Sequence, residues 1–99
     1  MVMRQLKQAD YDQLVCYLHQ YAQADVFGTE YQIVLTADET RYLLRLRPDS
    51  RRRVYLLCAV CEEHTERGTA YRQEAGCACQ TLMGLLVGQA RLYGLRSAM

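Results

Sequence analysis

The sequence lacks the motifs by which most enzymes are recognised, and it lacks long hydrophobic runs. It contains no P-loop, no dinucleotide-binding glycine motif, no nucleophile elbow and no pair of carboxylates in an apolar setting. No apolar run is long enough to span a bilayer, and the first ten residues, MVMRQLKQAD, lack the apolar segment of a signal peptide. We therefore expect a cytoplasmic protein that is not an enzyme, stays out of membranes and needs no cofactor.

Proline is almost absent, with one residue in 99, and the chain has no linker, internal repeat or low-complexity tract. Because 51% of the residues are hydrophobic, the chain carries enough apolar surface to form a folded core. The sequence therefore predicts one domain over residues 1–99. The formal net charge of +1 argues neither for a strong nucleic-acid binder nor for an acidic tail.

The spacing of apolar residues predicts an α+β domain with the element order α-β-β-β-α. A first helix is expected at about Tyr11–Asp25, strands at Tyr31–Thr36, Thr40–Arg47 and Arg53–Cys61, a charged loop at Glu62–Thr69, and then a long second helix. Ala37–Glu39 is expected to be a hairpin turn, although Thr36–Glu39 also has the pattern of a helix cap. The strands should form a three-stranded antiparallel meander with both helices packed on one face.

The segment Glu74–Tyr93 has the clearest helical period in the chain, and it divides into two faces. The residues predicted to face the core are Ala75, Cys79, Leu82, Met83, Leu86, Ala90 and Tyr93. The opposite face carries a small-residue stripe that consists of Cys77, Thr81, Gly84 and Gly88. Glycine destabilises a helix by up to about 1 kcal/mol relative to Ala, so we predict that this stripe docks a partner or forms a homodimer. The alternative is that the core face secures the helix and the glycines are tolerated.

Basic residues are concentrated in one segment, because six of the eleven arginines fall between residues 41 and 53, against the single acid Asp49. This arginine patch consists of Arg41, Arg45, Arg47, Arg51, Arg52 and Arg53. Guanidinium groups form paired hydrogen bonds with phosphates and carboxylates. The patch is therefore predicted to contact either nucleic-acid phosphates or an acidic protein surface. A solvated strand edge, protected from aggregation by its charge, is the other interpretation.

Five cysteines in a short chain raise the question of disulfides or a metal. Without a secretion signal we expect reduced thiols. Cys58 and Cys61, followed by Cys77 and Cys79, have a spacing similar to that of zinc ligands, so a structural-zinc protein is the third hypothesis. Against it, residues three apart in a strand point to opposite faces, and residues two apart in a helix also diverge. Cys58 and Cys79 are therefore predicted to be small core side chains, with no metal bound.

Each of the two histidines lies near side chains with which it could form a catalytic or metal site. Cys16 and His19 are three apart on the first helix, but the middle of an open helix face lacks the orienting group and oxyanion hole of a nucleophilic site. His64 lies among Glu62, Glu63 and Glu66, which predicts a solvated acidic loop. Neither arrangement predicts catalysis.

The predicted order α-β-β-β-α resembles that of the double-stranded-RNA-binding domain. The stretch Gly68–Ala75, leading into a helix of small residues, is similar to that family's entry to its second helix. The family's basic pair at this point is matched only by Arg72, and Thr36–Thr40 stands where the family has a Gly-Pro-x-His loop. Since these are the elements that would touch RNA, the resemblance implies the topology and little of the binding chemistry.

These observations predict a small, non-enzymatic protein-binding module that masks a surface on a partner macromolecule. Size and an Arg-rich, Lys-poor composition suggest a bacterial or phage inhibitor or adaptor, for example one of the anti-CRISPR type. The alternative is a nucleic-acid-binding protein that uses the arginine patch. A protein partner is expected first, and a homodimer is the second expectation for the small-residue stripe.

Overall fold

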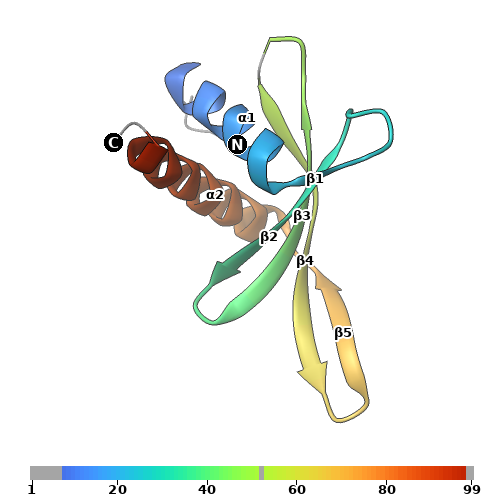
Figure 1. The fold of residues 1–99 in the computed structure, drawn as a ribbon. Coiled ribbons are helices and arrows are strands. Elements are labelled where there is room, and N and C mark those ends of the chain that lie inside the picture. The colour runs from blue at the N-terminus through green and yellow to red at the C-terminus, as the bar shows by residue number, and fades with distance from the viewer. Residues whose placement is uncertain (1–7, 52, 98–99) are drawn as a thin grey trace.

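Two helices pack on one face of a five-stranded antiparallel sheet in the computed structural model, which describes residues 8–51 and 53–97 (Figure 1). In chain order the elements are α1 (Gln8–Tyr21), β1 (Gln23–Ala24), β2 (Tyr31–Ala37), β3 (Thr40–Pro48), β4 (Val54–Thr65), β5 (Gly68–Gln73) and α2 (Gly76–Ser97). Each strand pairs with the next one in sequence, so the sheet is a simple meander. The predicted α+β class is confirmed, but the three-stranded meander is wrong because β1 and β5 add a strand at each edge.

The first helix ends earlier than predicted. It stops at Tyr21, and the segment expected to continue it to Asp25 instead forms β1, in which Gln23 pairs with Gln32 and Ala24 with Tyr31. The helical period of the side chains extends to Ala22, and the Ala22 N–H still bonds to the Leu18 carbonyl at 2.9 Å. The short pairing with β2 takes over directly afterwards, which periodicity alone does not reveal.

The hairpin between β2 and β3 is confirmed, and the alternative of a helix at this point is wrong. Ala37 pairs with Thr40, which leaves Asp38 and Glu39 as the two turn residues. Both have positive φ, 51° and 62°, as the tight hairpin turn that matches the twist of the strands requires. The observed strands exceed the predicted ones by one residue each, Ala37 and Pro48.

The predicted charged loop at Glu62–Thr69 is wrong. Strand β4 continues to Thr65, and β5 returns along it from Gly68, so the two strands form a long hairpin that projects beyond the helices (Figure 1). Arg72 of β5 pairs with Glu63 of β4 at 2.8 Å. Strand β5 is exposed along its whole length, so its sequence shows no alternation of apolar and polar residues. Within Gly68–Ala75, the stretch similar to the RNA-binding family's helix entry, Gly68–Gln73 is a strand, and the second helix begins at Gly76.

The core lies between the sheet and the two helices. Alternate residues of the strands point into it, and the buried hydrophobic residues are Leu14, Tyr17, Leu18, Tyr31, Ile33, Leu35, Leu44, Leu46, Val54, Ala59, Cys61, Leu82, Leu86, Val87 and Ala90. The predicted core face of the second helix is confirmed at Leu82, Leu86 and Ala90, with Cys79 and Met83 partly buried against the core. The prediction of this core face is wrong at Ala75, which precedes the helix and is exposed, and it did not include the buried residue Val87.

The two helices run side by side in opposite directions (Figure 1). Tyr17 and Tyr21 of α1 and Tyr93 of α2 form an aromatic cluster with ring centroids 4.7 to 5.3 Å apart. Tyr93 remains 36% exposed, so it covers the cluster from the surface and is not the core residue that its spacing predicted. Asp10 and Arg91 join the helices by an ion pair of 2.6 Å.

Candidate protein-binding surface

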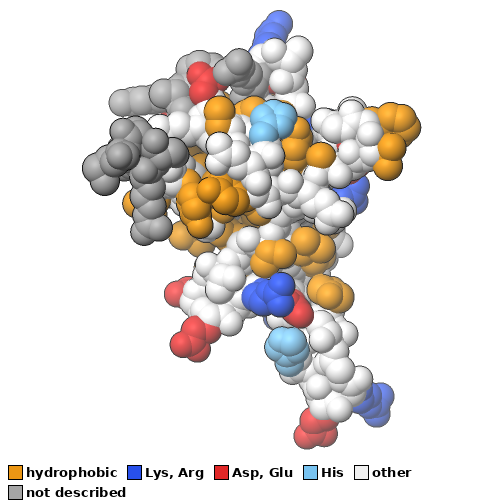
Figure 2. Space-filling view, viewed as in Figure 1, with side chains coloured by type: hydrophobic (Ala, Val, Ile, Leu, Met, Phe, Trp, Pro, Cys, Tyr) orange, Lys and Arg blue, Asp and Glu red, His pale blue; other side chains and the backbone are white. Residues whose placement is uncertain are grey.

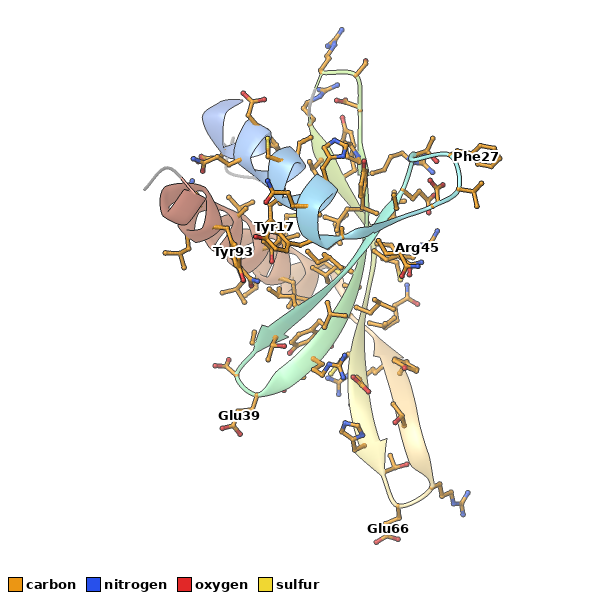
Figure 3. The ribbon with its side chains drawn as sticks, in the orientation of Figure 1. Tyr17, Phe27, Glu39, Arg45, Glu66 and Tyr93 are labelled. Atoms are coloured by element: carbon orange, nitrogen blue, oxygen red, sulfur yellow. The ribbon has the colours of Figure 1, made fainter. Side chains whose placement is uncertain are left out.

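One face of the sheet is not covered by the helices. Figure 3 places Arg45 on the side of the strands away from Tyr17 and Tyr93 of the two helices. The strand alternation that buries Tyr31, Ile33 and Leu35 directs the intervening residues to this outer face. The outer face of the sheet is therefore not covered by either helix.

An apolar row crosses the outer face. Val34 of β2 pairs with Leu43 of β3, and Leu43 pairs in turn with Val60 of β4, so their side chains lie next to one another. Val34 is 45% exposed, and the other two are half-buried. Farther along β4, two more hydrophobic residues are exposed: Leu57, at the bulge that shifts the pairing of β4 with β3, and Tyr55, which pairs with Arg47.

Charged side chains flank the apolar row on both sides. On one side, Arg45 and Arg47 donate hydrogen bonds to the two oxygens of Glu30, at 2.6 and 2.8 Å. These contacts, the one from Arg45 above all, lower the pKa of the Glu30 carboxyl below its ordinary value. On the other side Arg41 pairs with Glu62 at 3.5 Å. The apolar centre is thus bordered by ion pairs, which is the usual anatomy of a protein interface.

The arginine patch is brought together only in part. Arg41, Arg45 and Arg47 share the outer face, as strand alternation predicts, but each is paired with an acid that the sequence pattern did not indicate. Arg53, in the next turn, pairs with Asp49 at 3.1 Å. The Arg51 side chain has no acidic partner among the described residues, and Arg52 lies outside them.

A loop between β1 and β2 presents two apolar side chains to solvent. Val26 is 95% and Phe27 85% exposed, and Figures 2 and 3 show hydrophobic side chains at the tip of this loop, with Phe27 on the same side of the sheet as Arg45. Phe27 is the one phenylalanine of the chain. At this exposure the two side chains contribute little to the packing of the core.

Hydrogen bonds within the loop fix its shape. The Thr29 N–H donates to Oδ1 of Asp25 and the Thr29 hydroxyl to Oδ2, both at 2.7 Å. The Gly28 N–H donates to the Asp25 carbonyl at 3.0 Å, and Gly28 has a φ of 69°, which disfavours other residues. The Asp25 N–H donates to the Glu30 carbonyl at 2.9 Å, so the loop ends at the residue that binds Arg45 and Arg47.

Together the loop and the outer face form one surface, which we name the outer patch. It consists of Val26, Phe27, Glu30, Val34, Leu43, Arg45, Arg47 and Val60. Sequence reasoning identified only the two arginines. The signal that could have indicated the loop is the isolated pair Val26-Phe27 directly before a glycine.

The small-residue stripe lies on the surface of α2. Cys77, Thr81 and Gly84 are exposed and Gly88 is half-buried, and apart from the adjacent residues and the backbone of the helix itself, no atom lies within 4 Å of where a Cβ would stand at either glycine. Leu85 and Leu92, which border the stripe, are exposed too. The stripe is therefore accessible, and its role as a docking or dimer surface stays a prediction.

The cysteines do not converge. Cys58 and Cys61 belong to one continuous strand, and their pairing with Arg45 and Tyr42 places them on opposite faces. Cys61, not Cys58, is the buried residue, so the prediction of Cys58 as a core side chain is wrong. Burial raises the pKa of the Cys79 thiol, which keeps it protonated. Over the described residues, no group of three or more His, Cys, Asp or Glu side chains is placed to hold a metal ion.

His19 is engaged in the structure and not in a nucleophilic pair. Its Nδ1 forms a 2.8 Å hydrogen bond with the hydroxyl of Tyr31 in β2, and the two rings meet edge to face. Cys16 is exposed. The histidine therefore ties α1 to the sheet.

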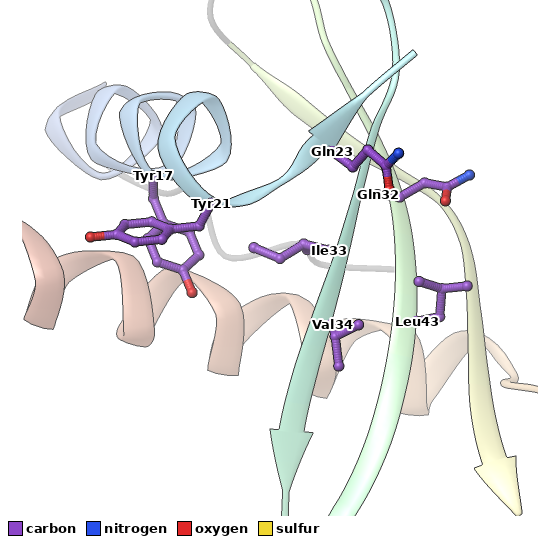
Figure 4. Close-up of a pocket in the computed structure, with 7 residues that line it drawn as sticks. All are labelled: Tyr17, Tyr21, Gln23, Gln32, Ile33, Val34 and Leu43. Atoms are coloured by element: carbon purple, nitrogen blue, oxygen red, sulfur yellow. The ribbon is translucent and has the colours of Figure 1, made fainter.

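A shallow depression of about 330 Å³ lies where α1 meets the edge of β2 (Figure 4). It is lined by Tyr17, Tyr21, Gln23, Gln32, Ile33, Val34 and Leu43. No carboxylate, imidazole or thiol lines it, so it offers no group for acid–base or nucleophilic chemistry at neutral pH.

Comparison with known proteins does not add an assignment. No protein-family model, no curated protein and no solved structure matches the chain. Within the part of the chain that the structure describes, neither helix is long and apolar enough to cross a membrane.

Proposed function

We propose that this protein is a small, non-enzymatic binding module that acts by covering a surface of another protein with its outer patch. The observation that carries the proposal is the Val26–Phe27 pair, which is held almost fully exposed by the hydrogen bonds of Asp25. Burying such side chains against a partner contributes about 25 cal/mol per Å² of apolar surface. A loop that is already ordered also loses little conformational entropy on binding.

The rest of the outer patch supports a protein partner. The apolar row Val34, Leu43 and Val60 would form the dry centre of an interface, and the ion pairs of Glu30 with Arg45 and Arg47 would lie at its rim. An inhibitor or adaptor that occupies a functional surface needs no more than this. The bacterial or phage origin and a defence complex as target rest on composition and size alone.

Nucleic acid is the less favoured partner, because the acids that pair with the arginine patch reduce its attraction to phosphate. Arg41, Arg45, Arg47 and Arg53 each already bind a carboxylate. A polyanion would have to displace these contacts and would gain little from an overall charge of +1. An apolar row at the centre of the surface also offers nothing to a phosphate backbone.

The proposal is tested by capture of partners from a bacterial lysate, followed by measurement of affinity between the purified proteins. The double variant Val26→Asp/Phe27→Asp should lose the partner while its circular dichroism spectrum stays unchanged. Leu92→Asp tests the other candidate surface, since Leu92 is an exposed apolar residue that borders the small-residue stripe of α2, and loss of the partner with this variant alone would contradict the proposal. Equal partner binding by the loop variant and the wild type, or a partner that is a nucleic acid, would contradict the proposal.

A further inference from the structure

Strand β5 leaves one edge of the sheet open. The Glu74 N–H, just after the strand, donates to the Ala59 carbonyl of β4 at 2.9 Å. Since backbone groups alternate in direction along a strand, Ala70 and Arg72 also turn theirs toward β4. The N–H and C=O groups of Thr69, Tyr71 and Gln73 therefore point away from the sheet, and all three residues are exposed. Each of them offers a donor and an acceptor to a further strand.

The residues of this edge that would bond to a further strand carry neither charge nor proline. Natural edge strands carry lysine, proline or inward-pointing charge that discourages an added strand. Thr69, Tyr71 and Gln73 have uncharged side chains, and Tyr71 is 64% exposed. Arg72 points to the other face, where Glu63 and Glu74 bind it. The hairpin projects beyond the helices, so a second molecule can approach β5 without meeting them (Figure 1).

We propose that β5 pairs antiparallel with β5 of a second copy of this chain, about a two-fold axis at Tyr71. In this register Tyr71 faces Tyr71 of the second copy, and Thr69 faces Gln73 in both directions. All the outward N–H and C=O groups of the three residues then meet a partner, and the two tyrosine rings form a cross-strand aromatic pair. Arg72 lies opposite Ala70, so no like charges meet.

Neighbouring registers are worse for physical reasons. A pairing centred on Arg72 sets two guanidinium groups directly opposite each other. A pairing centred on Ala70 places Gln73 opposite Arg67, in the turn, where no ladder continues. In a register shifted by one residue, the outward N–H and C=O groups of one copy lie opposite backbone groups of the other copy that already bond to β4. The edge is therefore self-complementary in one register, which is what a symmetric interface requires.

This pairing is independent of the proposed function. It joins the two five-stranded sheets into one continuous sheet and leaves the small-residue stripe of α2 out of the interface. A dimer that formed through the stripe would be abolished by Gly88→Arg, whereas the β5 dimer would not be affected by that variant.

The test introduces a charge of either sign at Tyr71. The dimer dissociation constant is measured by sedimentation equilibrium of the full chain over a concentration series. Tyr71→Lys and Tyr71→Glu should each raise the dimer dissociation constant at least about tenfold, since like charges then meet across the axis. A mixture of the two variants should restore association as a heterodimer. Gln73→Pro should weaken the dimer as well, because it removes an outward N–H, and Thr36→Pro at the opposite sheet edge should not.

A wild-type chain that stays monomeric at millimolar concentration would overturn the proposal. So would a dimer that both Tyr71 variants leave intact, or a mixture of these variants that fails to associate. Loss of the dimer with Gly88→Arg would assign the interface to the small-residue stripe and would overturn the proposal too.

Discussion

Gln89 of α2 donates a 2.6 Å hydrogen bond from Nε2 to the Tyr17 hydroxyl of α1, across 72 positions of the chain. Tyr17 is only 6% exposed, so its hydroxyl needs a partner inside the protein. The bond lies beside the aromatic cluster and fixes how the two helices face each other.

Tyr17→Phe should lower the free energy of unfolding by about 1 kcal/mol, because the variant leaves the Gln89 amide without its partner. Urea denaturation measures the loss. Gln89→Ala should cause a similar loss, and the double variant should lose less than the sum of the two. Strict additivity would show that the hydroxyl and the amide do not interact.

The same hydroxyl should make stability fall at high pH. Burial raises the pKa of Tyr17 above its ordinary value of about 10, so the unfolded chain releases this proton first. The stability that the protonated Tyr17 contributes is fully present below about pH 10, and it is lost as the pH rises through the raised pKa of the folded state. A pH series of melting temperatures should therefore be flatter for Tyr17→Phe than for the wild type above about pH 10.

Asp25→Ala should loosen the loop that presents Val26 and Phe27. The measurement is amide hydrogen exchange at Thr29, which should become faster, while exchange in β3 stays unchanged. Thr29→Ser retains both donors to Asp25 and should behave like the wild type. The hydrogen bonds from Thr29 lower the pKa of Asp25, so the ordered loop is stable above the ordinary pKa of an aspartate and is lost as pH falls through the lowered one.

Glu39→Gly should stabilise the protein by about 1 kcal/mol, since a left-handed backbone costs a non-glycine residue roughly that much. Its φ of 62° is one that glycine adopts freely. Thermal unfolding checks the sign. Glu66→Gly, in the other two-residue hairpin turn, is the control, because Glu66 does not have a positive φ and glycine there should not raise the melting temperature.

Gly84→Ala should also stabilise the chain, by up to about 1 kcal/mol, because Gly84 is helical and a Cβ there meets open space. The opposite sign is expected for Gly28→Ala, where the φ of 69° strains an added side chain although the space is equally open. If both variants were stabilised, the loop conformation described for Gly28 would be wrong.

Glu30→Ala should unmask Arg45 and Arg47. The affinity of the variant for DNA, measured by fluorescence anisotropy over a salt series, should then exceed that of the wild type. Each phosphate contact adds roughly −0.9 to the slope of log K against log salt, so two freed arginines should steepen it by up to about 1.8. An unchanged slope would mean that the carboxylate does not mask these side chains.

The central hairpin and much of the buried face of α2 could be predicted because their apolar residues follow a regular period. The period is two residues in the strands and about 3.6 in the helix. Strand β5 could not be predicted, since both of its faces are solvated and its residues follow no period. The pairing of Glu30 with Arg45 and Arg47, over 15 and 17 positions, appears only when β2 and β3 lie in register. Val26 and Phe27 were missed because an exposed apolar residue has the same composition signal as a buried one.

The contact of α1 with α2 also sets the order in which the chain matures during synthesis. The strands form a meander of neighbours and can pair as they leave the ribosome, but the apolar faces of α1 and of the sheet are covered only when α2 follows. Until Leu82, Leu86 and Ala90 emerge, Leu14 and Leu18 lack these members of the core cluster to which they belong. A nascent chain stopped at the end of β5 is therefore expected to be protease-sensitive, and cooperative folding should begin only once the second helix has been added.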